Sequence, residues 1–260
     1  MSGFEVVVPT RGNIEAVCVG LLSQAAHKPF PINFVTARLP ETPRERCAVE
    51  MLRGLGCDIR FSLQRREGGA AAWAQGIEEL SMDVGVFLDD DAALIPKSAL
   101  NDLAFSSHGS PWVAPVIRFA ANLSNPPEDH TELWGNVRHD NPAVQRALSR
   151  YGDGWIRVFE IGEDVFSDQL GGTCFAATRE RLQASGAVET LMRWPKYVGG
   201  RDYYLGAKLG VGRILSGIYA YHWGTYTPEK WGMAEMGRRM LYSTPELYAT
   251  EARLEGHGTL

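Results

Sequence analysis

Four short apolar segments alternate with helix-like segments in the first 90 or so residues, and this order limits the fold more than any other feature of the chain. Each apolar segment has the length and composition of a strand, and the segments between them carry apolar residues at helical spacing. A β-α-β-α-β-α-β order predicts a mostly parallel sheet with helices on both faces, whose right-handed crossovers bring the strand ends to one edge. The predicted strands are Phe4–Val8, Pro31–Thr36, Asp58–Leu63 and Val84–Leu88.

The helices between these strands have recognisable boundaries. Asn13 stands where it can cap the first of them. The second covers Arg44–Leu55 and ends among glycines, and the third covers Gly68–Leu80 and begins at a glycine pair. The first part of the chain is therefore expected to form an α/β unit of Rossmann-like order.

Three consecutive aspartates, Asp89–Asp91, end the fourth strand. Alternation along a strand places Asp89 and Asp91 on one face and Asp90 on the other. Neighbouring carboxylates repel unless a cation lies between them, and a hard divalent metal suits that arrangement. The alternative is an acidic turn in which Asp91 caps the next helix. We favour a metal site, because three charges at the end of a buried strand are costly without a partner.

Length and charge exclude several classes of protein. A chain of 260 residues suits one large α/β domain, and a net charge of −5 gives no general basic field for holding nucleic acid. The four cysteines show no C-x-x-C pair, which predicts reduced thiols and a cytoplasmic protein. Neither a signal peptide nor an apolar run long enough to span a bilayer is recognisable.

The second half of the chain is less regular. Residues 120–168 are polar, rich in turns and have more acid than base, which is typical of a functional or mobile excursion, although an ordinary surface loop is the alternative. The other segments are expected to be regular. Strands are predicted at Trp112–Phe119, Gly171–Thr178 and Gly212–Tyr221, and helices from Arg179, at Tyr204–Leu209 and at Pro228–Leu254.

Four segments together resemble the GT-A fold glycosyltransferases, specifically the inverting type of family 2. Val6–Arg11 resembles their opening strand and loop, and Phe87–Asp91 resembles their DxD motif. Gly171–Phe175 resembles the small-residue strand below their acceptor site, and Gly199–Leu205 their G-x-[ED]-D-x-x-L segment. The resemblance implies one GT-A catalytic domain over residues 1–224, with a nucleotide-binding half at about 1–100 and an acceptor-binding half at about 101–224. Residues 225–260 would form a C-terminal helical tail.

The resemblance implies a metal-dependent enzyme that moves a sugar from a nucleotide-diphosphate donor to an acceptor hydroxyl. Mn²⁺ or Mg²⁺ would be held by Asp91, with Asp89 and His222 as further ligands, although His222 also fits an ordinary core or surface residue. Two of the nucleotide-side residues have alternatives, because Arg11 also fits a solvated loop charge and Asp90 also fits a side chain that points back into the protein. The expected nucleotide-binding residues are Pro9, Thr10, Arg11, Arg65, Arg66, Asp89 and Asp90.

Asp202 is the candidate general base, since an inverting transfer needs a carboxylate to take the proton of the acceptor hydroxyl. The N-terminus of a helix would keep that carboxylate ionised, and the alternative is that Asp202 simply caps the helix. The family often has glutamate before this aspartate, where this chain has Arg201, which would pair with Asp202 or bind phosphate or acceptor. The expected acceptor-binding residues are Gly171, Gly172, Arg201, Tyr203 and Trp223.

Other functions remain open at this stage. A sugar-nucleotide-forming nucleotidyltransferase would have a glycine-rich first loop, which Pro9–Gly12 is not. A hydrolase and a non-catalytic sugar-nucleotide-binding module of the same fold are the further alternatives. The second strand ends in Thr36–Leu39 where many family members carry an acidic pair, so the donor nucleotide is not defined. The acceptor is open among glycan, lipid-linked sugar, metabolite, protein side chain and modified nucleic-acid base, and a homodimer is also left open.

Overall fold

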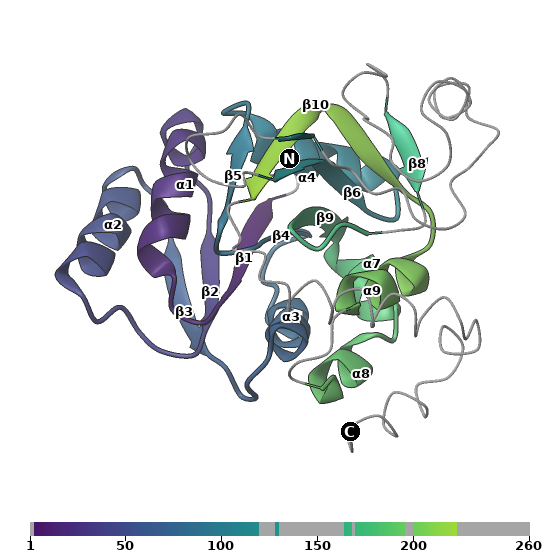
Figure 1. Cartoon of the computed structure of the whole chain (residues 1–260), viewed down its shortest axis with the longest axis horizontal. Coiled ribbons are helices and arrows are strands. Elements are labelled where there is room, and N and C mark those ends of the chain that lie inside the picture. The colour runs from purple at the N-terminus through teal and green to yellow at the C-terminus, as the bar shows by residue number, and fades with distance from the viewer. Residues whose placement is uncertain (1–2, 120–127, 130–163, 168–169, 196–199, 223–260) are drawn as a thin grey trace.

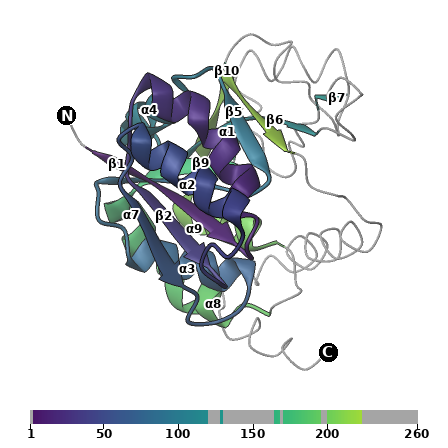
Figure 2. The same cartoon turned by 90° about the vertical axis from the view of Figure 1, so that its left-hand side faces the viewer.

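The computed structural model describes residues 3–119, 128–129, 164–167, 170–195 and 200–222. Its strands form one sheet with helices against both faces, as Figure 1 and Figure 2 show from two directions. The predicted helix at Pro228–Leu254, the tail 225–260 and most of the polar excursion lie outside the described residues. The division into nucleotide-binding and acceptor-binding halves therefore stays a prediction.

Four parallel strands form the half of the sheet that the sequence predicted. The first of them continues past its expected end through Pro9 to Thr10, since both residues pair with the second strand. Its pairing with the fourth strand stops at Val7. Pro9 therefore lies where the first strand is paired on one side only, and a residue without an N–H group is tolerated there. In spatial order the strands are β3 (Ile59–Leu63), β2 (Ile32–Thr36), β1 (Phe4–Thr10) and β4 (Val84–Leu88).

The other half of the sheet mixes directions, which the sequence did not predict. The order continues from β4 through β9, β6 and β10 to β5, with β9 antiparallel to both neighbours and β10 parallel to β6. β5 follows Asp91 directly, so the alternative in which Asp91 caps a helix is wrong. The strands are β5 (Ala92–Ile95), β6 (Val113–Phe119), β9 (Cys174–Thr178) and β10 (Gly212–His222), with the short β7 (Glu128–Asp129) on β6 and β8 (Val165–Ser167) on β10.

Helices cover both faces of this sheet. One core cluster joins the sheet to α1 (Ile14–His27), α2 (Pro43–Gly54) and α4 (Ala99–Ser106), which the short η1 (Ser107–Gly109) follows. The other cluster joins the opposite face to α3 (Gly69–Glu78), α7 (Arg179–Ala184), α8 (Val188–Arg193) and α9 (Arg201–Leu209).

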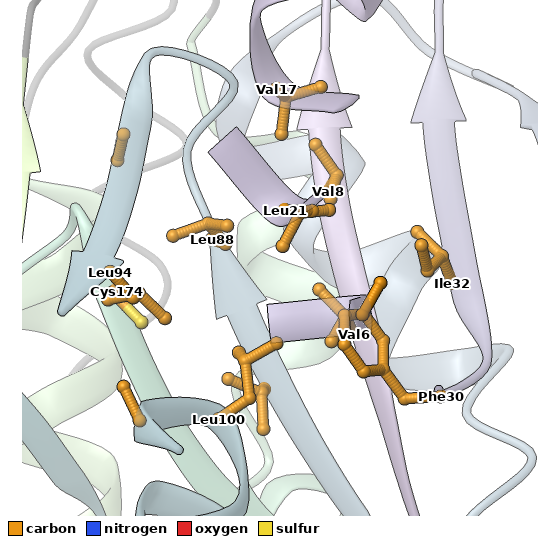
Figure 3. Close-up of a cluster of buried hydrophobic side chains, with 14 of the residues drawn as sticks. Val6, Val8, Val17, Leu21, Phe30, Ile32, Leu88, Leu94, Leu100 and Cys174 are labelled. Atoms are coloured by element: carbon orange, nitrogen blue, oxygen red, sulfur yellow. The ribbon is translucent and has the colours of Figure 1, made fainter. Parts of the chain in front are cut away.

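The alternation of β1 divides its side chains between these two cores. Val6 and Val8 lie in the cluster with α1, whereas Val7 lies in the cluster with α3, and all three are fully buried. Figure 3 shows Val6 and Val8 beside Leu21 of α1. Burying an aliphatic side chain of this size stabilises the fold by about 1.5–3 kcal/mol, so apolar residues on both faces commit β1 to the centre of the sheet.

All four cysteines are free thiols, as the sequence predicted, and Cys47 is the exposed one. Within the described residues, no helix is both long enough and apolar enough to cross a membrane.

The small residues of α3 let that helix pack closely on β1 and β4. A Cβ atom at Gly76 would lie 2.5 Å from Cγ1 of Val7 and 3.3 Å from Cε1 of Phe87. This contact holds α3 close to the sheet, and Gly69 and Trp73 lie in the N-terminal half of the same helix.

Replacing Gly76 with alanine should therefore lower stability. The added methyl group overpacks the contact with Val7, at a cost of about 1–3 kcal/mol. Thermal unfolding would show a melting temperature about 2–4 °C lower for each kcal/mol lost.

Gly54→Ala is the matched control, because Gly54 is also helical and a Cβ there meets no atom within 4 Å. Alanine at Gly54 should leave the melting temperature unchanged or raise it slightly. Equal losses at the two positions would contradict the close packing of α3 on the sheet.

Candidate active site

Asp89 begins the site at the carboxyl end of β4. Its backbone N–H donates to the carbonyl of Thr173 at 2.9 Å, which keeps it in line with the antiparallel neighbour β9. The chain then turns through Asp90 and Asp91, both half-buried, into β5. The aspartate segment is thus a tight connection between two strands, with its carboxylates at the carboxyl edge of the sheet.

Asp90 ties this turn to the loop after β1. The hydroxyl of Thr10 donates to Oδ2 of Asp90 and accepts from the N–H groups of Gly12 and Asn13, each at 3.0 Å. Asn13 occupies the N-cap position of α1, but its side chain donates to the Asp90 carbonyl at 3.1 Å and makes no capping bond. Burial raises the pKa of the Asp90 carboxyl, the Thr10 hydrogen bond opposes that rise, and the charge of Asp91 adds to it. Asp90 therefore points into the protein, which was the alternative prediction for this residue.

Asp89 faces a different neighbour, the first turn of α9. Its Oδ1 atom lies 3.9 Å from Nη2 of Arg201. The guanidinium of Arg201 lies over the indole of Trp73 on α3, 4.9 Å from the ring centroid. The guanidinium of Arg201 on α9 therefore contacts both α3, through Trp73, and the aspartate turn after β4, through Asp89.

Asp202, the candidate base, lies against the turn before β9. A Cβ atom at Gly172 would be only 3.0 Å from Oδ2 of Asp202, so the glycine leaves room for that carboxylate. The N-cap of α9 is Gly200 in the left-handed region, with φ 90°, and Asp202 lies within the first turn. Asp202 is therefore not the N-cap residue, and its carboxylate stands at the positive end of the helix.

The predicted metal ligands come from the turn between β4 and β5 and from the end of β10. His222 ends β10, and its register partner on β5 is Ala92, the residue after Asp91. Only the backbone of His222 is described, and among the described side chains no three of the types His, Cys, Asp and Glu gather as a metal site. Carboxylate oxygens such as those of Asp89 and Asp91 are donors that suit Mn²⁺ or Mg²⁺, and His222 stays a predicted third ligand.

The two arginines after β3 make contacts within the protein. Arg65 pairs with Glu78 and, at 3.6 Å, with Glu79 at the end of α3. Arg66 donates from Nη1 to the carbonyl of Met192 on α8 at 2.8 Å. Both side chains are exposed, and their expected role at the nucleotide stays a prediction.

Four of the remaining predicted residues lie among the described ones. Pro9 is half-buried and Arg11 is exposed, both in or next to the loop after β1. Gly171 precedes β9, and Tyr203 packs on the core cluster around α3. Trp223 lies outside the described residues.

Sequence analysis missed a clamp on the β1 loop. Arg38 donates from Nη2 to the carbonyl of Gly12 at 2.9 Å and forms a two-point ion pair with Glu45, at 2.6 and 3.1 Å. Glu45 also accepts from the backbone of Thr42, whose side chain caps α2 in return. The spacing Thr42-x-x-Glu45 is a sequence signature of a capping box and would have predicted it.

A second missed residue is Gln64, just after β3. Its Nε2 atom donates to the carbonyls of Thr10, at 3.1 Å, and Val35, at 3.2 Å, which ties β1, β2 and β3 together at their carboxyl ends. The Arg38 clamp and Gln64 together hold the loop that leads from Thr10 into α1.

The Glu45 carboxylate should make stability depend on pH. The hydrogen bond from Arg38 lowers its pKa from 4.5 to about 2. Because the folded pKa lies below the unfolded one, the stabilisation is complete above about pH 5 and is lost as pH falls toward about pH 2. Glu45→Gln should therefore melt below the wild type at neutral pH, and the difference should close across this window in thermal scans.

Glu50→Gln is the matched control, since Glu50 lies on the same helix but pairs with Arg53 on the exposed surface. That variant should track the wild type at every pH. A Glu45→Gln difference that stays constant from pH 7 to pH 2 would contradict the proposed ion pair.

With this geometry defined, solved structures identify the fold, although the sequence matches no protein-family model and no curated protein. GalNAc-T7 with UDP, GalNAc and Mn²⁺ aligns at TM-score 0.61 and 15% identity, over 96% of this chain and 50% of that one. S. aureus TarS 1–349 with UDP-GlcNAc aligns at TM-score 0.58 and 13% identity, over 98% and 71%. A mycobacterial protein aligns at TM-score 0.52 and 16% identity, over 93% and 74%.

These structures are similar to the chain in fold. Their sequence identities to the chain are too low to assign their activities to it. The chain spans about half the length of the GalNAc-T7 chain. The structural neighbours are GT-A glycosyltransferases, and the chain has their GT-A fold, which confirms the predicted fold class.

Proposed function

We propose that this protein is a metal-dependent inverting glycosyltransferase that moves a sugar from a nucleotide-diphosphate donor to an acceptor hydroxyl. The supporting observation is the meeting of the Asp89–Asp91 turn with the first turn of α9, which carries Asp202. The carboxylates that would hold a cation and the carboxylate that would accept a proton then belong to segments that contact each other.

On the donor side, Asp91 and Asp89 would hold the divalent cation. When bound, that cation would neutralise the charge of the departing diphosphate. The loop from Pro9 to Gly12 would line the nucleotide, and the bonds from Thr10 to Asp90 and from Arg38 to Gly12 hold it beside the aspartate turn. A loop fixed before the donor arrives loses little entropy on binding.

On the acceptor side, Asp202 would take the proton of the acceptor hydroxyl as its oxygen attacks the anomeric carbon. The bond from that carbon to the diphosphate oxygen breaks on the opposite face, so the configuration inverts. The N-terminus of α9 favours the ionised form of Asp202, which a base requires. Gly171 and Gly172 would leave the approach to this carboxylate open.

The structural neighbours suggest which ligands to try first. GalNAc-T7 was seen with UDP and Mn²⁺, and TarS with UDP-GlcNAc. We therefore take UDP and Mn²⁺ as probes, while the sugar and the acceptor stay open. The four free thiols suit a reducing compartment, and we propose the cytoplasm.

Asp91→Ala should abolish metal-dependent donor binding. A ligand at 100 times its Kd stabilises the native state by about 2.7 kcal/mol. In a thermal-shift assay with Mn²⁺, UDP should accordingly raise the wild-type melting temperature by about 5–10 °C, and the part of that shift that requires Mn²⁺ should vanish in Asp91→Ala.

Asp83→Ala is the control, because Asp83 lies at the opposite end of β4, is largely exposed, and should respond as the wild type does. Asp202→Asn is the complementary variant, since it should keep the UDP shift while losing acceptor-dependent release of UDP from the donor. If no nucleotide diphosphate shifts the wild type under any metal condition, the proposed function is wrong.

A further inference from the structure

Two charged side chains in the first turn of α9 lie against different parts of the site. Asp202 lies against Gly172, in the half expected to bind the acceptor. Arg201 instead contacts Asp89 and Trp73, and its guanidinium would lie 3.3 Å from a Cβ at Gly69. These three contacts of Arg201 all belong to the half expected to bind the nucleotide.

The charge of Arg201 is less tightly paired than that of several other arginines among the described residues. Its ion pair with Asp89 spans 3.9 Å, beyond hydrogen-bond length. Its Nε atom is buried and makes no hydrogen bond within the described residues. By contrast, carboxylate oxygens lie at 2.6–2.8 Å from Arg38, Arg53, Arg60 and Arg193. Arg179 and Arg213 also have long ion pairs, at 3.7 and 3.5 Å, but with Asp83 and Asp164, away from the aspartate turn.

Among the described residues, the guanidinium is held in place without a hydrogen bond to its Nε atom. The Trp73 ring supports one side of it, an arrangement that favours a cation over an aromatic face. Glycine at position 69 leaves the space that it fills, since a Cβ there would crowd the guanidinium carbon. The side chain is 30% exposed, and that of Asp89 is 21% exposed, so a ligand at the aspartate turn can reach both.

We propose that Arg201 binds the diphosphate of the donor and stabilises it as it leaves. This inference rests on the proposed function and adds a second positive group to the donor side of that site. A planar guanidinium presents paired N–H donors that match phosphate oxygens. As the bond from the anomeric carbon to the diphosphate oxygen breaks, the electron pair goes to that oxygen, which the N–H groups of Arg201 hydrogen-bond without transferring a proton.

The proposal predicts anion binding that does not need a metal. We would measure the affinity of the full chain for UDP, pyrophosphate and uridine by calorimetry in EDTA. Arg201→Gln should weaken UDP and pyrophosphate about 10- to 100-fold, the scale for losing a charge-assisted hydrogen bond, and leave uridine unchanged. Arg201→Lys should restore part of the loss, because it keeps the charge but not the fork.

Arg193→Gln is the matched control, since Arg193 carries the same charge on the exposed end of α8 and pairs with Glu189. It should bind all three ligands as the wild type does. A separate titration with Mn²⁺ alone should show that Arg201→Gln binds the metal at least as well as the wild type, because a cation is removed from beside Asp89.

The outcomes separate this inference from the proposed function. If the wild type binds UDP and Arg201→Gln binds it equally well, Arg201 does not contact the diphosphate, and the proposed function stands. If Arg201→Gln loses uridine and Mn²⁺ as well, Arg201 only supports the shape of the site, and the inference is wrong. If the wild type binds neither UDP nor pyrophosphate with or without Mn²⁺, both proposals fail.

Discussion

The hydrogen bond from Thr10 to Asp90 joins the carboxyl ends of the two central strands, and the rest of the site depends on that junction. A buried carboxylate without a partner would be costly, so this bond fixes how the aspartate turn leaves β4. With Asp90 directed at the β1 loop, Asp89 is left facing α9. Asp90 thus has a structural partner in Thr10, whereas Asp89 and Asp91 are the residues to which we assign the metal in the proposed function.

Two arginine–carboxylate pairs near this junction differ in how closely their atoms approach. The Arg38–Glu45 pair is tight and serves the backbone, since Arg38 also holds the Gly12 carbonyl. The Arg201–Asp89 contact is long and lies at the site, and the buried Nε atom of Arg201 has no hydrogen-bond partner among the described residues. Buried polar groups are normally satisfied in native proteins, and the exceptions call for a functional explanation. The contrast supports a structural role for Arg38 and a ligand-facing role for Arg201.

The sequence predicted the parallel half of the sheet well, because hydrophobic periodicity and local turns define a βαβ order. It did not predict that β9 runs antiparallel between β4 and β6, since pairing between distant strands depends on tertiary contacts. It placed Asp89 and Asp202 at a common site through the resemblance to GT-A enzymes. Stacking of Arg201 on Trp73 could not be predicted, because α3 and α9 are far apart in the chain and no local spacing relates them.

The most direct test of the account is where Mn²⁺ binds relative to the aspartate turn. Crystals grown with Mn²⁺ and UDP would locate the ion by its anomalous scattering. The account predicts an ion coordinated by the carboxylate of Asp91 and an oxygen of the diphosphate, at the carboxyl end of β4. An ion bound elsewhere, or UDP bound away from the Asp89–Asp91 turn, would contradict it.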